Sequence, residues 1–271
     1  MSAKPELSGD VDLGPSPDGE VEEYRMTLLE HLWELRTRMI RSMIALFVSF
    51  GVLLPFGGWL NEFLRKPAQP YFPEGSSFSS ISPLEIFVTN LKMSLFAAVF
   101  LAAPALFYQA WKFVAPGLYK SERRLVLPFV LFSTLFFTAG AAFCYVYILP
   151  FAMKFLLGFS GDGINSAISV AAYLSDVTRL LLAFGAVFEL PLAIFFLARA
   201  GIVSAAGLAS FRKYAVILIF VVAALLTPPD PVTQLGLAIP LLVLYEVGVI
   251  VARIWGRPKP DAPDAESTPT T

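Results

Sequence analysis

The chain has 271 residues, of which 56% are hydrophobic and only 15% are charged, and its formal net charge is −1. A soluble domain of this length cannot bury so much apolar surface, so composition excludes a water-soluble globular protein and indicates an integral membrane protein. The near-zero net charge argues against a broad nucleic-acid-binding surface, and no nucleic-acid partner is expected.

Residues 1–26 predict a disordered acidic tail ahead of the membrane domain. The first 25 residues hold seven acidic side chains against Lys4 and Arg25, with almost nothing that a core could bury. This is the reverse of the basic start of a cleavable secretory signal, so none is expected. A capping-box spacing from Thr27 to Glu30 predicts the start of a helix that runs directly into the first span.

Six hydrophobic segments then predict an all-α membrane domain over residues 27–253, followed by a second disordered tail over residues 254–271. Prolines inside the segments predict bent helices that form a concave wall. The fifth segment is shorter than the roughly 20 residues that cross a bilayer, which predicts local bilayer thinning or burial within the protein. The expected spans cover about 42–61, 93–111, 125–153, 174–198, 214–227 and 232–251.

Lys and Arg are concentrated on one side of these spans, and the positive-inside rule turns this asymmetry into an orientation. Without the distant Lys4, 14 basic residues fall on the side of both termini and 5 on the other. We therefore expect both termini in the cytoplasm, in agreement with an even number of spans. The inner set is Arg25, Arg36, Arg38, Arg41, Lys112, Lys120, Arg123, Arg124, Arg199, Arg212, Lys213, Arg253, Arg257 and Lys259; the outer set is Arg65, Lys66, Lys92, Lys154 and Arg179.

A dense charged stretch, EHLWELRTR, lies just before the first span. On a helical wheel Glu34 and Arg38 share one face and the leucines occupy the other, so the helix is expected to present its carboxylates to the cytoplasm. One interpretation is a solvated face with a Glu34–Arg38 pair that contributes only about 0.3–0.5 kcal/mol. The other is that Glu34 binds a ligand. Arg36 projects toward the apolar flank, where it would reach lipid phosphates or pack on the protein.

A second charged segment, FVAPGLYKSERR, joins the second and third spans on the same side. Glu122 lies at the expected start of the next helix, where the helix dipole favours an ionised carboxylate. Lys120, Arg123 and Arg124 are typical of positive-inside anchors. Glu34 and Glu122 together would suit a ligand with paired guanidiniums and a hydrophobic tail, because the planar fork of Arg fits a carboxylate bidentately.

Glu189 lies near the middle of the fourth predicted span. A charge there costs at least about 2.5–3.5 kcal/mol, so Glu189 is expected to be protonated, paired or facing water, and a functional or assembly role is the default. Thr233 and Gln234, early in the sixth span, are candidate polar partners. No metal-ligand spacing, phosphate loop or catalytic Cys/His cluster occurs in the sequence, so neither an enzyme nor a cofactor nor a bound metal is expected.

These motifs, with SPLEIFVTNLK, AFGAVFELP, LLTPPDPVTQ and AIPLLVLYEVGV, resemble the TatC family, the multi-spanning core of the twin-arginine protein translocase. The resemblance covers about Thr27 to Arg253. It implies a receptor for the Arg-Arg signal peptides of folded proteins in the cytoplasmic membrane of a prokaryote, powered by the proton-motive force. It also implies that Glu34, Arg36 and the Lys120–Arg124 stretch recognise the Arg pair, with Glu122 as the central carboxylate.

The resemblance also bears on the membrane interior. Glu189 corresponds to the family's buried glutamate, which is associated with a polar patch where the single-span partners TatA and TatB act. Gln234 and Asp230 fall within the family's motif between spans five and six. Glu85 departs from the pattern, since many members have an aromatic or apolar residue there, and this puts the local packing of the outer side in doubt. Contacts with the lipid bilayer and self-association complete the expected partners.

Two other functions stay open from the residues alone. A proton-coupled transporter of small solutes would use Glu189 as its relay, and solute uptake into liposomes holding this protein alone would support it. An intramembrane enzyme would need catalytic Ser, His or metal ligands inside the spans, and the sequence lacks them.

Overall fold

The structure is a computed structural model that describes residues 28–72, 76–80, 82–114, 126–158, 167–227 and 231–256. The expected tail over residues 1–26 lies outside these ranges, as do residues 257–271, whereas residues 254 and 255 still belong to the last helix. In chain order the elements are α1 (Leu28–Leu53), a 3₁₀ turn (Leu54–Phe56), α2 (Gly57–Arg65), a 3₁₀ turn (Gln69–Tyr71), β1 (Ser77–Ser79), α3 (Pro83–Val114), α4 (Val126–Phe143), a π-helical turn (Cys144–Ile148), α5 (Leu149–Gly158), β2 (Ala167–Ser169), α6 (Val170–Phe188), α7 (Leu190–Arg199), α8 (Ala205–Leu226) and α9 (Pro231–Trp255).

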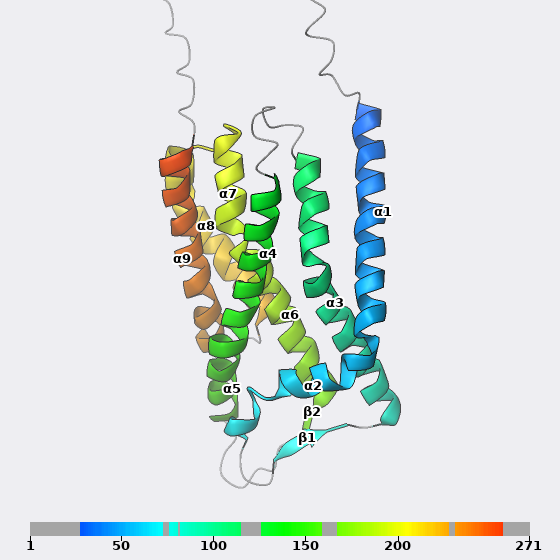
Figure 1. Ribbon diagram of the computed structural model, residues 1–271. Coiled ribbons are helices and arrows are strands. Elements are labelled where there is room, and N and C mark those ends of the chain that lie inside the picture. Colours follow the sequence, from blue (N-terminus) through cyan, green and yellow to red (C-terminus); the bar gives the residue numbers. More distant parts are fainter. Residues whose placement is uncertain are drawn as a thin grey trace, which may run out of the picture.

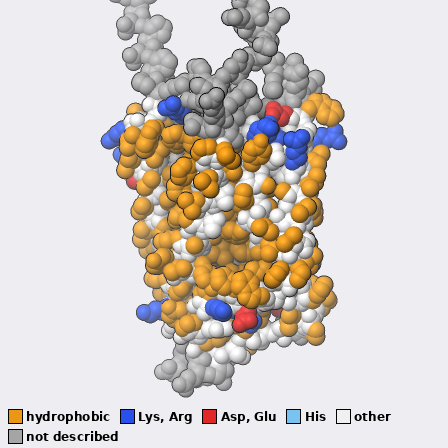
Figure 2. Space-filling view, in the orientation of Figure 1, with side chains coloured by type: hydrophobic (Ala, Val, Ile, Leu, Met, Phe, Trp, Pro, Cys, Tyr) orange, Lys and Arg blue, Asp and Glu red, His pale blue; other side chains and the backbone are white. Residues whose placement is uncertain are grey.

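The helices stand side by side as one bundle with two distinct ends (Figure 1). The start of α1 and the end of α9 lie at one end, here termed the termini end. Helix α2 and the two short strands lie at the other, termed the cap end. Between them the visible surface is mostly hydrophobic, with charged side chains gathered toward both rims (Figure 2).

Six helical stretches are long and apolar enough to cross a membrane, which confirms the predicted all-α fold with six spans. The expectation that the first helix runs directly into its span is also confirmed, because α1 is continuous over 26 residues. These stretches cover Leu32–Tyr71, Pro83–Phe113, Leu127–Gly158, Val170–Arg199, Ala205–Leu226 and Thr233–Trp255.

The expected shortness of the fifth span was wrong. Helix α8 has 22 residues and begins before the basic pair Arg212 and Lys213 rather than after it. Its start is set by Ser204, whose hydroxyl accepts a hydrogen bond from the Gly207 amide at 3.0 Å, a typical N-cap. Most of its side chains are exposed, which contradicts the expected burial within the protein.

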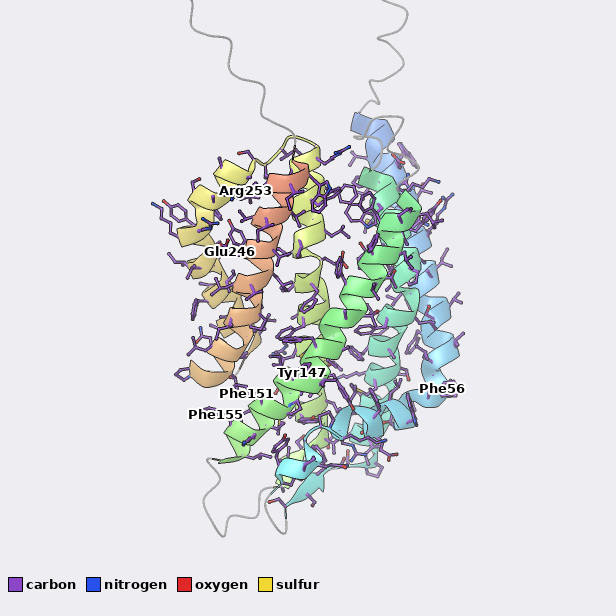
Figure 3. The ribbon with its side chains drawn as sticks, turned by 60° about the vertical axis from the view of Figure 1, so that its left-hand side comes forward. Phe56, Tyr147, Phe151, Phe155, Glu246 and Arg253 are labelled. Atoms are coloured by element: carbon purple, nitrogen blue, oxygen red, sulfur yellow. The ribbon has the colours of Figure 1, made fainter. Side chains whose placement is uncertain are left out.

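Prolines bend or divide several spans, as expected. Pro104 lies inside α3 and Pro240 inside α9. Pro191 is the second residue of α7, just after the break that ends α6, and Pro150 is the second residue of α5, just after the π-helical turn. Proline lacks the amide hydrogen that would continue the helical ladder, so each break leaves backbone carbonyls for other partners. In Figure 3 the rings of Tyr147, Phe151 and Phe155 descend along the turn and α5 toward the cap end, and Phe56 marks the bend from α1 into α2.

Helix α6 forms the centre of the packed core. Leu174, Val177 and Phe184 are among the largest fully buried side chains. Helix α4 approaches α6 so closely at Gly140 that a Cβ atom there would lie 2.5 Å from the Phe184 carbonyl oxygen and 2.8 Å from Cγ of Phe188. Small residues at such crossings let two membrane helices pack backbone to backbone.

The cap end is a hydrogen-bonded assembly of α2, the strands and the helix starts. Strands β1 and β2 pair in parallel, with Phe78 opposite Ile168. Glu85 belongs to this assembly: its two carboxylate oxygens accept hydrogen bonds from Ser80 at 3.2 Å and from Ser169 at 3.4 Å. The acid that departs from the family pattern is therefore a tie between the strand region and the start of α3.

Candidate functional site

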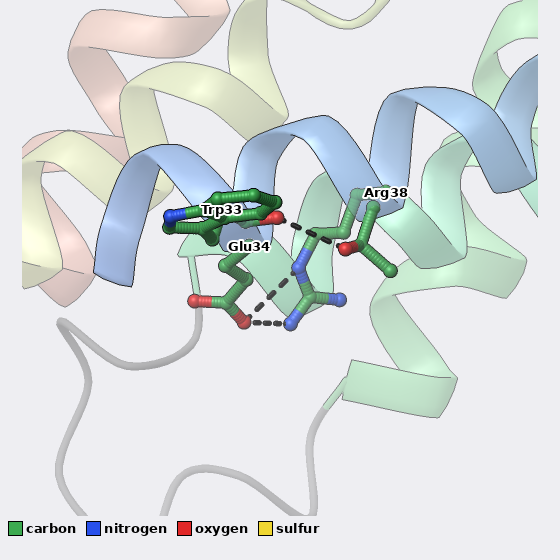
Figure 4. Close-up of polar contacts among 4 residues, drawn as sticks. Trp33, Glu34 and Arg38 are labelled. Carbon is green, nitrogen blue, oxygen red and sulfur yellow. Dashed lines mark hydrogen bonds and ion pairs between the residues drawn. The ribbon is translucent and has the colours of Figure 1, made fainter. Parts of the chain in front are cut away.

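Glu34 and Arg38 form an ion pair on the inward face of α1, near the termini end (Figure 4). The Glu34 Oε1 atom accepts hydrogen bonds from both Nε of Arg38, at 3.1 Å, and Nη2 of Arg38. Arg38 is only 8% exposed, whereas Leu32 and Met39 on the other face are 59% and 57% exposed. The expected solvated face was therefore wrong: the charged face turns toward α3, which packs along α1, and the apolar face turns outward.

The inward direction of this face has a physical reason. A helix that borders lipid exposes its apolar side chains to acyl chains and turns polar groups to the protein interior. The pair nevertheless leaves two polar atoms without a hydrogen-bond partner in the described part of the chain, Oε2 of Glu34 and Nη1 of Arg38, and both are buried. The Glu34 side chain as a whole is 21% exposed.

Arg36 lies on the exposed side of α1. Its guanidinium carbon is 5.3 Å from the centroid of the Trp33 ring, a cation–π contact that holds Arg36 along the apolar flank. Arg36 thus lies on the apolar flank where it was expected, and it points away from the Glu34–Arg38 pair.

Glu122, Lys120, Arg123 and Arg124 lie outside the described residues, so their geometry is not assigned. The helices on either side of this segment are described. Helix α3 ends and α4 begins at the termini end of the bundle, the same end at which α1 starts (Figure 1).

Glu189 occupies the break between α6 and α7, where it is the residue that ends one helix and precedes the other. Its carboxyl lies beside the Ser133 hydroxyl and the backbone of Phe137, both on α4. Ser133 is fully buried and accepts a hydrogen bond from the indole N–H of Trp111 at 2.8 Å. A polar chain thus runs from α3 through α4 to Glu189, although Oε1 of Glu189 itself remains buried without a partner among the described residues.

Thr233 and Gln234 do not lie with Glu189. Gln234 donates a hydrogen bond from Nε2 to the Phe220 carbonyl of α8 at 3.1 Å. Thr233 lines a cavity of about 240 Å³ together with Asp176 of α6. Glu189 follows Asp176 by thirteen positions, which at about 1.5 Å per residue places it roughly 20 Å further along the helix. The candidate partners and Glu189 therefore belong to two separate polar regions.

Trp111 and Ser133 were missed by sequence reasoning. A tryptophan near a helix end and a serine inside an apolar helix are common in membrane helices, so only the fold indicates that Trp111 bonds to Ser133 and that Ser133 lies beside Glu189. No cluster of three or more potential metal-ligating side chains occurs within the described ranges.

A second cavity, of about 330 Å³, is open on one face of the bundle and almost wholly apolar. Its walls come from α2, α3, α4 and α6. The face drawn in Figure 2 is hollowed and lined by hydrophobic side chains. The largest lining groups are Leu60, Phe63, Phe96, Phe100, Tyr145 and Leu181.

The sequence and the fold were compared with known proteins. A family model described as "Sec-independent protein translocase protein (TatC)" matches residues 30–240. The chain belongs to the TatC family. The TatC protein of Desulforapulum autotrophicum is 46% identical over 238 residues, which are 88% of each chain, and that of Escherichia coli K12 is 39% identical over 233 residues, 86% of this chain and 90% of that one.

Solved structures agree with the family assignment. A crystal structure described as the twin-arginine translocase receptor TatC superposes with a TM-score of 0.76 at 40% identity, and covers 84% of this chain and 100% of the other. This TatC-family chain is therefore a multi-pass membrane component of a protein translocase and is not an enzyme. The alternative of a small-solute transporter finds no support, since the matched family transports proteins.

Proposed function

We propose that this TatC-family chain is the receptor that binds Arg-Arg signal peptides of folded proteins for export across the cytoplasmic membrane of a prokaryote. In this proposal the termini end faces the cytoplasm, as the distribution of Lys and Arg favours. The observation that carries the proposal is Glu34: a partly exposed carboxylate at that end, whose Oε2 atom has no hydrogen-bond partner among the described residues.

The Arg pair would be shared between two carboxylates, Glu34 on α1 and Glu122 after α3. A hydrogen bond between charged groups contributes about 1.5–3 kcal/mol, so two carboxylates can together select paired guanidiniums over lysines. Lys120, Arg123 and Arg124 would flank Glu122 and repel a third cationic group. Arg36, stacked on Trp33, would tether the start of α1 at the membrane surface.

The hydrophobic stretch of the signal would lie along the concave helices of the bundle. The 330 Å³ cavity supports this part of the proposal, because it is open and lined almost only by apolar and aromatic groups. An apolar segment that fills such a hollow replaces lipid or water with close side-chain contacts.

Glu189 would serve assembly and transport rather than signal recognition. It is a carboxyl group inside a span, one of whose oxygens has no hydrogen-bond partner among the described residues, and such groups mark functional sites. We assign its region to contacts with TatA- and TatB-type single-span partners, with Thr233 and Gln234 as a second polar contact region. Copies of this chain would also associate with one another. The proton-motive force would supply the energy, in line with the absence of a phosphate loop in the sequence.

Photo-cross-linking to an Arg-Arg signal peptide tests the receptor role. A photoreactive residue at position 34 or 122 should capture the peptide, and a peptide with Lys-Lys in place of Arg-Arg should be captured much less. Glu34→Gln and Glu122→Gln should each weaken binding of the peptide, and the double variant should abolish it. Glu246→Gln is the matched control, because Glu246 is an exposed carboxylate at the same end that pairs with Arg212. Unchanged binding in the double variant would refute the receptor site.

Export separates recognition from transport. Glu189→Ala should leave binding of the signal peptide unchanged and still abolish export of a folded reporter protein in cells whose own copy is deleted. Loss of peptide binding in Glu189→Ala, with normal expression, would instead place Glu189 in the recognition site.

A further inference from the structure

Arg38 engages Glu34 in an asymmetric way. A guanidinium and a carboxylate commonly pair through two parallel hydrogen bonds that use both oxygens. Here Nε and Nη2 of Arg38 both bond to Oε1 of Glu34, so Oε2 is not used. Figure 4 shows Oε2 of Glu34 and the third guanidinium nitrogen of Arg38 on opposite sides of the pair.

The two atoms left over are complementary to an arginine-containing peptide. Oε2 of Glu34 is a charged acceptor, and Nη1 of Arg38 is a charged donor, and both are buried without a partner within the described ranges. A buried polar atom without a hydrogen bond is unfavourable, so a ligand that satisfies it gains the full bond. A peptide arginine offers both groups, since its guanidinium donates and its backbone carbonyl accepts.

We propose that Arg38 is a positioning residue of the signal-peptide site. It fixes the Glu34 carboxylate through Oε1, so that Oε2 accepts a hydrogen bond from one guanidinium of the Arg-Arg pair. Its own Nη1 donates to a backbone carbonyl of the same peptide. This inference rests on the proposed receptor function and adds a residue to it. Because Arg38 is four residues from Glu34 on one helix, the geometry is set by α1 alone and does not depend on the segment that holds Glu122.

A purely structural role for Arg38 is the alternative, in which it only neutralises Glu34 between α1 and α3. The conservative variant Arg38→Lys separates the two roles. It keeps the positive charge beside Glu34, so a structural role predicts normal stability and normal peptide binding. A positioning role predicts normal stability with weaker peptide binding, because lysine lacks the planar fork that holds Oε1 and has no counterpart of Nη1.

The experiment measures binding of a fluorescent Arg-Arg signal peptide to the purified full-length protein in nanodiscs, alongside thermal unfolding. Arg38→Lys keeps the charge but loses the planar fork and Nη1, and is expected to bind about tenfold more weakly or worse, the equivalent of one hydrogen bond to a charged group. Arg41→Lys, an exposed arginine on the same helix, is the control and should bind as the wild type. Wild-type affinity in Arg38→Lys would overturn the inference.

A peptide-side measurement covers the case in which these variants fail to fold. On the wild-type protein, a thioamide in place of the carbonyl of either signal arginine weakens the acceptor for Nη1 and should lower the affinity several-fold at one of the two positions. Equal affinity for both thioamide peptides and the parent would overturn the role of Nη1. The receptor proposal fails separately, when the wild-type protein does not distinguish Arg-Arg from Lys-Lys peptides.

Discussion

Replacing Gly140 by alanine tests whether the α4–α6 crossing positions Glu189. The added Cβ would lie 2.5 Å from the Phe184 carbonyl oxygen and 2.9 Å from Cβ of Phe188, and neither is the flexible end of a side chain. The helices must therefore separate. Overpacking of this kind costs about 1–3 kcal/mol. Because Phe188 directly precedes Glu189, the same displacement should lengthen the contact between Glu189 and α4.

Gly51→Ala is the matched control for this change. Gly51 is also a helical glycine inside a span, and a Cβ atom there would meet nothing within 4 Å. Both substitutions gain about 1 kcal/mol of helix propensity. The difference in unfolding temperature between the two variants therefore reports the clash alone. For a chain of this size, each kcal/mol of destabilisation lowers the unfolding temperature by about 2–4 °C. Gly140→Ala should therefore unfold in detergent several degrees below Gly51→Ala. Export of a reporter should fall only in Gly140→Ala. Equal unfolding temperatures would refute the close approach.

Three further experiments test hydrogen bonds and ion pairs of the bundle. Ser133→Ala should destabilise the protein by about 1–3 kcal/mol in thermal unfolding, because it leaves the buried Trp111 indole N–H without its acceptor. Ser133→Thr keeps the hydroxyl and should recover part of the lost stability. Tyr173→Phe removes a buried hydrogen bond to a carbonyl at the end of α2 and should cost about 1 kcal/mol, and a neutral result would mean that this tie contributes nothing. A double-mutant cycle on the exposed Arg212–Glu246 pair should give coupling too small to detect in high salt, whereas strong salt-independent coupling would contradict its exposure.

Much of the fold could be predicted from the sequence because the membrane imposes local rules. A span needs a minimum length of apolar residues, so the six segments are visible without any tertiary contact. Helix ends were harder to place. The basic pair in the first half of α8 resembled a boundary, yet the N-cap at Ser204 and the long stems of Arg212 and Lys213 allow the helix to begin earlier.

The candidate site divides in the same way. Glu34 and Glu189 could be chosen as candidates from residue type alone. A carboxylate beside or inside a membrane is costly wherever it packs, so it indicates a functional site by default. The sequence could not tell which face of α1 turns inward, because the same amphipathic pattern fits a helix on water and a helix on lipid with opposite orientation. The tertiary structure decides this: Arg38 is buried, and the apolar side chains of the other face are exposed.

The sequence by itself determined that this chain crosses a membrane six times and belongs with protein translocases of the TatC family, since span length, charge asymmetry and continuous motifs are all properties of short segments. Only the tertiary structure decided the partners of its few polar side chains. It placed Ser133 and Trp111, rather than Thr233 and Gln234, in the polar region of Glu189. Such pairings join residues far apart in the chain, and they depend on how bent helices cross, which no local pattern encodes.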